Sequence, residues 1–222
     1  MSDATIEAAH CLPPIEDESF TFSTAEVGVI CVMICEAVMF ATLLIAYLVY
    51  LGKSVVGPFP RDVLSLPVAL LNTVFLVSSS LTIELAVKAL RKTGAREGAS
   101  HHSARAVDPT SDSSSAFRAW MWITAGLALL FLLGTMYEWK ELIFEHGLTI
   151  GRNLFGTTYF TLIGCHALHV AVGMGLMLLF IVLSRRGALA EGTEGPHLLG
   201  WYWHLVDGVW IVLLVVVYMF GR

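Results

Sequence analysis

The sequence predicts an all-α protein, a polytopic membrane bundle of five transmembrane helices. Of its 222 residues, 56% are hydrophobic and only 14% are charged, whereas about 25% are charged in a typical soluble domain. Five segments are apolar over roughly 20 residues, the length that a helix needs to cross a bilayer. The net charge of −5 argues against nucleic acid as a partner, because phosphate contacts need a basic face.

The chain begins with an acidic tail, residues 1–25, which contains no Lys or Arg. This tail lacks the basic start and early apolar core of a secretory signal, and we expect it on the cytoplasmic side. Residues 26–222 form one transmembrane domain. Its five helices are predicted at about residues 27–51, 66–90, 117–139, 154–184 and 198–220.

The connections between these helices differ in composition. Residues 52–62 are rich in turn formers. Residues 91–116 are rich in Ser, Ala and Gly, and we predict a flexible loop there. We expect His101 and His102, inside that loop, to be solvated. The fourth segment contains no turn and no polar break, so we expect one long helix that is tilted or extends beyond the membrane.

The distribution of Lys and Arg predicts the orientation. Eight of them lie on the side of the N-terminal tail and five on the opposite side. Since cytoplasmic loops carry the excess of positive charge, we predict a cytoplasmic N-terminus and a C-terminus on the periplasmic or extracellular side.

Glu36 is an unusual residue for a membrane helix. It follows Glu26 by ten residues, which places it roughly 15 Å along the first helix. An ionisable residue at the centre of a bilayer costs roughly 2.5–3.5 kcal/mol on insertion scales, so it needs a partner or a water-filled site. Glu36 is therefore a candidate for proton uptake or lipid contact. The alternative is a protonated carboxyl that is hydrogen-bonded to a neighbouring helix.

His166 and His169 share one face of the fourth helix at i, i+3. Two histidines at this spacing could hold a metal with Glu84 or Glu138 from neighbouring helices, or could ligate a haem. Haem ligation by two histidines normally takes one from each of two helices, so we favour interhelical hydrogen bonds.

Polar residues also lie in the last helix, where His204 and Asp207 share a face at i, i+3. A carboxylate that accepts a hydrogen bond from an imidazole fixes its tautomer, and this pair needs partners on another helix. Trp201, Tyr202 and Trp203 are predicted to lie in the aromatic belt at the membrane interface.

The remaining polar candidates lie in the second and third helices. Asn72 can bond across helices, Glu84 can pair with Lys88 at i+4, and Trp139 is expected at the interface. We predict no catalytic residue and no metal ligand, and we expect the buried His and Asp residues to clamp the third to fifth helices together. The residues expected to be buried and structural are Asn72, Glu138, His166, His169, His204 and Asp207.

Four strings together resemble one family, over about residues 26–222. They are CEAVMFATLLIAY (35–47), LNTVFLVSSSLTIELA (71–86), GTTYFTLIGCHALHV (156–170) and WYWHLVDGVWIVLLVVVYMFG (201–221). In this order they are similar to subunit III of the haem–copper cytochrome c and quinol oxidases. Five helices match the short bacterial type, and the sequence departs from the family at Leu205, where Phe is usual, and at Gly208.

The resemblance implies a non-redox subunit of a proton-pumping terminal oxidase that reduces O2 to water in a bacterial inner membrane. Such a subunit packs mainly on catalytic subunit I, beside subunit II, and supports proton uptake and stability. It implies that the haems and copper belong to the partner subunits, that this chain binds no redox cofactor, and that it binds phospholipids.

Three other functions remain open from the residues. One is a subunit-III-like accessory protein of a nitric-oxide reductase system. Another is a stand-alone transporter. The third is a membrane metalloenzyme that uses His166, His169, His204 and a carboxylate.

Overall fold

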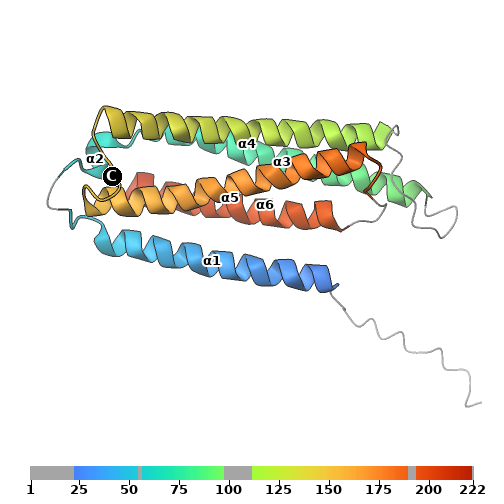
Figure 1. Cartoon of the computed structure of the whole chain (residues 1–222), viewed down its shortest axis with the longest axis horizontal. Helices are drawn as coiled ribbons and strands as arrows, with labels where there is room; N and C mark the ends of the chain where they lie inside the picture. The colour runs from blue at the N-terminus through green and yellow to red at the C-terminus, as the bar shows by residue number, and fades with distance from the viewer. Residues whose placement is uncertain (1–22, 55–56, 98–111, 190–193, 222) are drawn as a thin grey trace, which may run out of the picture.

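The computed structural model describes residues 23–54, 57–97, 112–189 and 194–221. Long helices lie side by side in an elongated bundle (Figure 1), and five of them are long and apolar enough to cross a membrane. The predicted fold class is therefore confirmed. Residues 1–22 of the acidic tail and residues 98–111 of the predicted loop, with His101 and His102, lie outside the described residues.

Helix α1 (Thr24–Tyr50) begins at a capping box. The Ser23 hydroxyl accepts from the backbone N–H of Glu26, and the Glu26 carboxylate accepts from the backbone N–H of Ser23. This arrangement satisfies two donors that would otherwise be left free at a helix start. The Ser23 hydroxyl also donates to Glu194 (2.6 Å), which lies directly before α6. The cap therefore anchors the beginning of the first span to the beginning of the last.

Helices α3 (Leu66–Glu97) and α4 (Asp112–Phe144) follow the short helix α2 (Pro60–Val63) and pack extensively on each other. Both are longer than predicted, since residues 91–97 continue α3 and residues 112–116 begin α4. The ends of the segment predicted as a loop are thus helical. Ala, Lys, Arg and Glu in residues 91–97 have high helix propensity, and Asp112 places a negative charge at the positive end of the α4 dipole.

Helix α5 (Leu154–Arg185) is one unbroken helix of 32 residues, as predicted from a segment with no polar break. The Asn153 side chain caps its start by accepting from the Gly156 N–H at 2.7 Å. After its end, Gly187 adopts φ +64°, a left-handed conformation that glycine reaches without steric cost. This turn lets the Ala188 N–H bond back to the Leu183 carbonyl at 3.0 Å, a common way to end a helix.

The last span consists of α6 (Gly195–Leu213) and the π-helix η2 (Leu214–Phe220). Pro196 lies in its first turn, where a missing backbone donor costs nothing. The span packs against α1, α3 and α5, and Trp203, Trp210 and Tyr218 from it are fully buried. In contrast, α1 buries only two described residues, Phe40 and Tyr47. The bundle is therefore built around the last span, with α1 at its edge (Figure 1).

Candidate functional site

Glu36 of α1 meets His169 of α5. The Nε2 atom of His169 lies 2.9 Å from a carboxylate oxygen of Glu36, and both side chains are partly buried. The Nδ1 atom of His169 lies 2.7 Å from the backbone carbonyl of Cys165. Since a carbonyl oxygen only accepts, Nδ1 carries a hydrogen and donates it. Nε2 is therefore the ring nitrogen that meets the Glu36 carboxyl, and the two contacts of His169 tie α1 to the backbone of α5.

Asp207 and His204 of α6 both reach α3. The Ser80 hydroxyl donates to a carboxylate oxygen of Asp207 and lies 3.2 Å from Nδ1 of His204. Asp207 is buried. Nε2 of His204 lies 3.9 Å from Glu84, which also forms an ion pair with Lys88 at 2.6 Å, as the i+4 spacing predicts. The polar pair of α6 thus finds its partners on the second span.

His204 differs from the prediction in its exposure. Its side chain is 41% exposed on the single chain, although we expected it to be buried. The physical reason is the helical rotation: a residue three positions from Asp207 is turned by about 60° from it. This rotation is enough to bring His204 to the edge of the α3–α6 contact while Asp207 stays inside.

His166 lies in an aromatic cage and is fully buried. Its ring stacks on Trp210 with the centroids 5.2 Å apart, and it meets the rings of Phe131 at 5.7 Å and Phe40 at 6.3 Å in edge-on geometry. Among the described residues, neither ring nitrogen has a hydrogen-bond partner. The interhelical hydrogen bonds that we favoured for the two histidines are therefore found for His169 and not for His166, whose imidazole packs as an aromatic ring.

A third polar contact lies near the other end of the bundle. The Tyr218 hydroxyl of η2 donates to Glu138 of α4 at 2.9 Å and lies 3.2 Å from the Tyr159 hydroxyl of α5. All three residues are buried. The contact joins the third, fourth and fifth spans. The clamp predicted for these three spans is thus made by Glu138 and two tyrosines, whereas the His and Asp contacts join the first span to the fourth and the second to the fifth.

Aromatic residues of α6 and α4 occupy different environments. Trp203, predicted at the interface, is instead fully buried and donates from Nε1 to the Ser79 hydroxyl at 2.9 Å, because it faces α3 and α5. Trp201 and Tyr202 are partly exposed, and the Tyr202 hydroxyl donates to the His169 carbonyl at 3.1 Å. Trp139 is also partly exposed and packs edge-on against Phe160.

Hydroxyl groups of α3 accept hydrogen bonds from the indole N–H groups of the last span. Besides the Trp203–Ser79 contact, Nε1 of Trp210 donates to Thr73 at 3.0 Å. Asn72 is 1% exposed and lies against Gly134 of α4. The partners that were not predicted from the sequence are Thr73, Ser79, Ser80, Tyr159 and Tyr218. Thr73 and Ser80 are seven residues apart, about two helical turns, and this spacing indicates that both lie on one polar face of α3.

Histidines and carboxylates are spread over several contacts. Within residues 23–54, 57–97, 112–189 and 194–221, no three His, Cys, Asp or Glu side chains lie close enough to hold a metal ion together. His166 and His169 lie on α5 and face the neighbouring helices α1, α4 and α6. His204 lies on α6 and faces α3.

The chain is similar to proteins of one family over nearly its whole length. The family model described as cytochrome c oxidase subunit III matches residues 16–222. A relative named cytochrome c oxidase subunit 3, from Thermostichus vulcanus, is 32% identical over 197 residues, which cover 88% of this chain and 87% of the relative.

Two further relatives match over similar lengths. Cytochrome c oxidase subunit 3 of Alkalihalophilus pseudofirmus is 29% identical and covers 84% of this chain and 82% of its own. Cytochrome bo(3) ubiquinol oxidase subunit 3 of Pseudomonas aeruginosa is 31% identical, and the match covers 85% of this chain and 81% of the relative. The matches therefore include all five spans, and the relatives' names include two kinds of electron donor.

Proposed function

Because the chain belongs to the cytochrome c oxidase subunit III family, we propose that it is the non-redox subunit III of a proton-pumping haem–copper terminal oxidase. Such an oxidase reduces O2 to water in aerobic electron transport. The observation that carries the proposal is the family match over residues 16–222, which includes every span of the bundle. The relatives' names cover cytochrome c and quinol oxidases, so the proposal is made for the class that contains both.

In this proposal the partners are other subunits of the same complex. The chain packs mainly on catalytic subunit I, with subunit II nearby, and the haems and copper belong to those partners. The polar contacts of the bundle support a structural role for this chain. Glu36–His169, Ser80–Asp207 and Tyr218–Glu138 each tie two spans together, which gives a larger partner a rigid flank to pack on.

Glu36 is the residue that we propose for proton supply. It is partly buried in an apolar span, and its carboxyl lies 2.9 Å from Nε2 of His169. A carboxyl and an imidazole in contact can relay a proton without a net charge in the membrane if one proton leaves the pair as another arrives. Glu36 would therefore act near the proton-uptake side of subunit I.

We further propose that the protein lies in a bacterial inner membrane with a cytoplasmic N-terminus and a periplasmic C-terminus. The multi-pass bundle and the bacterial relatives support this location. The excess of Lys and Arg on the N-terminal side supports the orientation.

The test is purification of the tagged chain from its native membrane in a mild detergent, followed by mass spectrometry of its partners and optical spectroscopy of haem. We expect catalytic subunits I and II to co-purify with their haem signals. His204→Ala should lower the yield of the complex and leave the haem spectrum of the retained complex unchanged, because His204 contacts α3 and no redox group.

Three results would overturn the proposal. One is a chain that purifies without an oxidase core. Another is iron or copper that stays with the isolated chain in stoichiometric amount. Recovery of a nitric-oxide reductase core instead would assign the chain to that system.

A further inference from the structure

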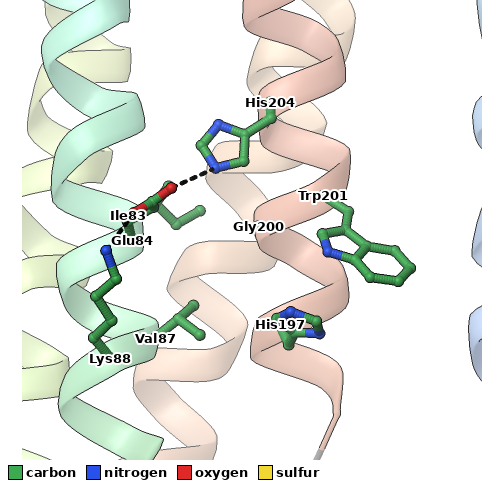
Figure 2. Close-up of a pocket in the computed structure, with 8 residues that line it drawn as sticks. All are labelled: Ile83, Glu84, Val87, Lys88, His197, Gly200, Trp201 and His204. Carbon is green, nitrogen blue, oxygen red and sulfur yellow. Dashed lines mark hydrogen bonds and ion pairs between the residues drawn. The ribbon is translucent and has the colours of Figure 1, made fainter.

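Polar side chains of α3 and α6 form a continuous series from an open hollow to a buried carboxyl. The hollow, about 220 Å³, lies between the two helices, and this volume holds several water molecules. Figure 2 shows Glu84 and Lys88 of α3 facing His204 of α6 across it. His204 is exposed, whereas Asp207, about one turn further along α6, is buried. Ser80 of α3 contacts both of them.

The series runs from the end of two spans to the middle of the membrane. Lys88 lies two residues before Leu90, where its span ends, and is therefore about 3 Å from that end along the helix axis. Asp207 lies twelve residues after Gly195, where its span begins, and is therefore about 18 Å from that end. Both span ends lie on the side that we propose to be cytoplasmic.

The hydrogens of the series have a defined order. The Ser80 hydroxyl has one hydrogen, which it donates to Oδ2 of Asp207. The Ser80 oxygen is then the acceptor for Nδ1 of His204, 3.2 Å away, so Nδ1 carries a hydrogen. In a neutral imidazole the other nitrogen is unprotonated, and here it is Nε2, which lies 3.9 Å from Glu84. The imidazole is therefore set to receive a proton from the hollow at Nε2.

We propose that this series is a proton path and that Asp207 is a proton-binding site loaded through it from the cytoplasmic side. A proton from water in the hollow binds Nε2 of His204. The Nδ1–H bond breaks as its proton passes to the Ser80 oxygen, and the Ser80 O–H bond breaks as its proton passes to Oδ2 of Asp207. Asp207 ends as a neutral acid, His204 ends neutral with its hydrogen on Nε2, and Ser80 keeps one hydrogen. The inference goes beyond the structural role proposed above for the Ser80–Asp207 contact.

The same contacts allow the transfer to run in reverse. In the loaded state Asp207 donates to the Ser80 oxygen, and the Ser80 hydroxyl donates to Nδ1 of His204, so both hydrogen bonds are kept with their directions exchanged. Glu84 supports the imidazolium that forms when a proton arrives, because opposite charges about 3.9 Å apart attract. Glu84 uses one carboxylate oxygen for this contact and the other for Lys88.

The neighbouring helices offer no competing route among their described residues. Helix α6 also packs on α1 and α5, whose carboxyl and imidazole groups away from the helix ends are Glu36, His166 and His169. Glu36 and His169 pair with each other at 2.9 Å, and His166 lies among aromatic rings. The path to Asp207 therefore stays between α3 and α6.

The test follows the Asp207 carboxyl by infrared difference spectroscopy of the complex that purifies with the chain. Transfer from H2O to D2O shifts the C=O stretch of a protonated carboxyl when its proton exchanges, and Asp207→Asn identifies the band that belongs to this residue. Ser80→Ala removes the central hydroxyl, whereas Ser80→Thr keeps it. Ser78→Ala is the matched control, because a residue two positions away is turned by about 160° and removes a hydroxyl from the opposite side of α3.

We expect the Asp207 band to shift at the same rate in the wild-type, Ser78→Ala and Ser80→Thr complexes. In Ser80→Ala the exchange should be slower by on the order of a hundredfold, the lower end of what a positioned proton-transfer group contributes. His204→Phe, which keeps a ring and removes both nitrogens, should slow the exchange to a similar extent.

Exchange at the wild-type rate in Ser80→Ala or in His204→Phe would overturn the inference, because the contacts would then be structural only. So would the absence of an exchanging Asp207 band in the wild-type complex at every pH tested, since the carboxyl would then take up no proton from the hollow. Failure of the proposed function has a different signature. The chain would then purify without an oxidase core, and the exchange at Asp207 can be measured in that preparation as well.

Discussion

Glu36 and His169 are 133 residues apart in the sequence, and their side chains meet at 2.9 Å to join α1 to α5. Because α1 buries only Phe40 and Tyr47 among its described residues, this polar contact adds to a small apolar contact between the helix and the bundle. The contact makes Glu36 a group that is hydrogen-bonded to a neighbouring helix.

The first prediction concerns the strength of this contact. Glu36→Ala and His169→Ala should each destabilise the complex, and a double-mutant cycle should give a coupling of about 0.6–1.7 kcal/mol, the range measured for interhelical hydrogen bonds in membranes. Thermal unfolding of the detergent-solubilised complex measures it. Thr42→Ala is the control, because the Thr42 hydroxyl is exposed and bonds only within α1. Additive effects of the two substitutions would show that the contact contributes nothing.

The second prediction concerns the close approach of α5 and α6. A Cβ atom at Gly173 would lie 2.7 Å from the ring of Trp203. Gly173→Ala should therefore push Trp203 away from its hydrogen bond with Ser79 and destabilise the protein by about 1–3 kcal/mol, the usual cost of overpacking.

The neighbouring glycine is the control for that substitution. Gly175→Ala meets nothing within 4 Å and should be neutral or slightly stabilising, because Ala favours a helix by roughly 1 kcal/mol over Gly. Both variants can be compared by thermal unfolding monitored through tryptophan fluorescence. If they unfold at the same temperature, Trp203 does not fix the α5–α6 distance.

The third prediction concerns the buried contact of Glu138. Tyr218→Phe removes the hydroxyl that donates to Glu138 and contacts Tyr159, and should cost about 1–3 kcal/mol because a buried acceptor loses its donor. Tyr137→Phe alters a tyrosine next to Glu138 whose side chain is exposed, and should change the stability little. Chemical denaturation of the two variants measures the difference, and equal midpoints would contradict the prediction.

The fourth prediction concerns orientation. Single cysteines replace Lys53 and Arg186, which are exposed at opposite ends of the bundle, in a background whose native cysteines are changed to alanine. A membrane-impermeant maleimide added to intact cells should label the cysteine at position 53. The cysteine at position 186 should react only after permeabilisation. The reverse pattern would place the N-terminus outside.

The helices could be predicted from the sequence because hydropathy and length determine them directly. The five apolar segments correspond to the five spans, and the absence of a polar break in residues 154–184 correctly indicated one unbroken helix. The ends were less predictable. Most of residues 91–97 are polar, and their Arg, Lys, Ala and Glu residues favour a helix. Hydropathy indicates where a helix leaves the membrane, whereas backbone hydrogen bonding decides where the helix ends.

The neighbours of each helix could not be predicted in this way. In water, an apolar stripe marks the buried face of a helix, but in a bilayer the lipid-facing side is apolar as well. Periodicity therefore did not reveal that Trp203 is buried or that His204 is exposed. The spacing of His166 and His169 predicted a shared face, yet one ring packs among aromatics and the other bonds to Glu36.

The position of α1 has a consequence for biogenesis. This helix is synthesised before the other described helices, but it packs mainly against α5 and α6, and its capping serine bonds to Glu194, 171 residues later. The turn after it is likewise joined to the start of α5, through Ser54 and Phe155. Helix α1 must therefore wait in the membrane for α5 and α6 before most of its tertiary contacts can form, while α3 and α4 can pair as soon as both have been inserted.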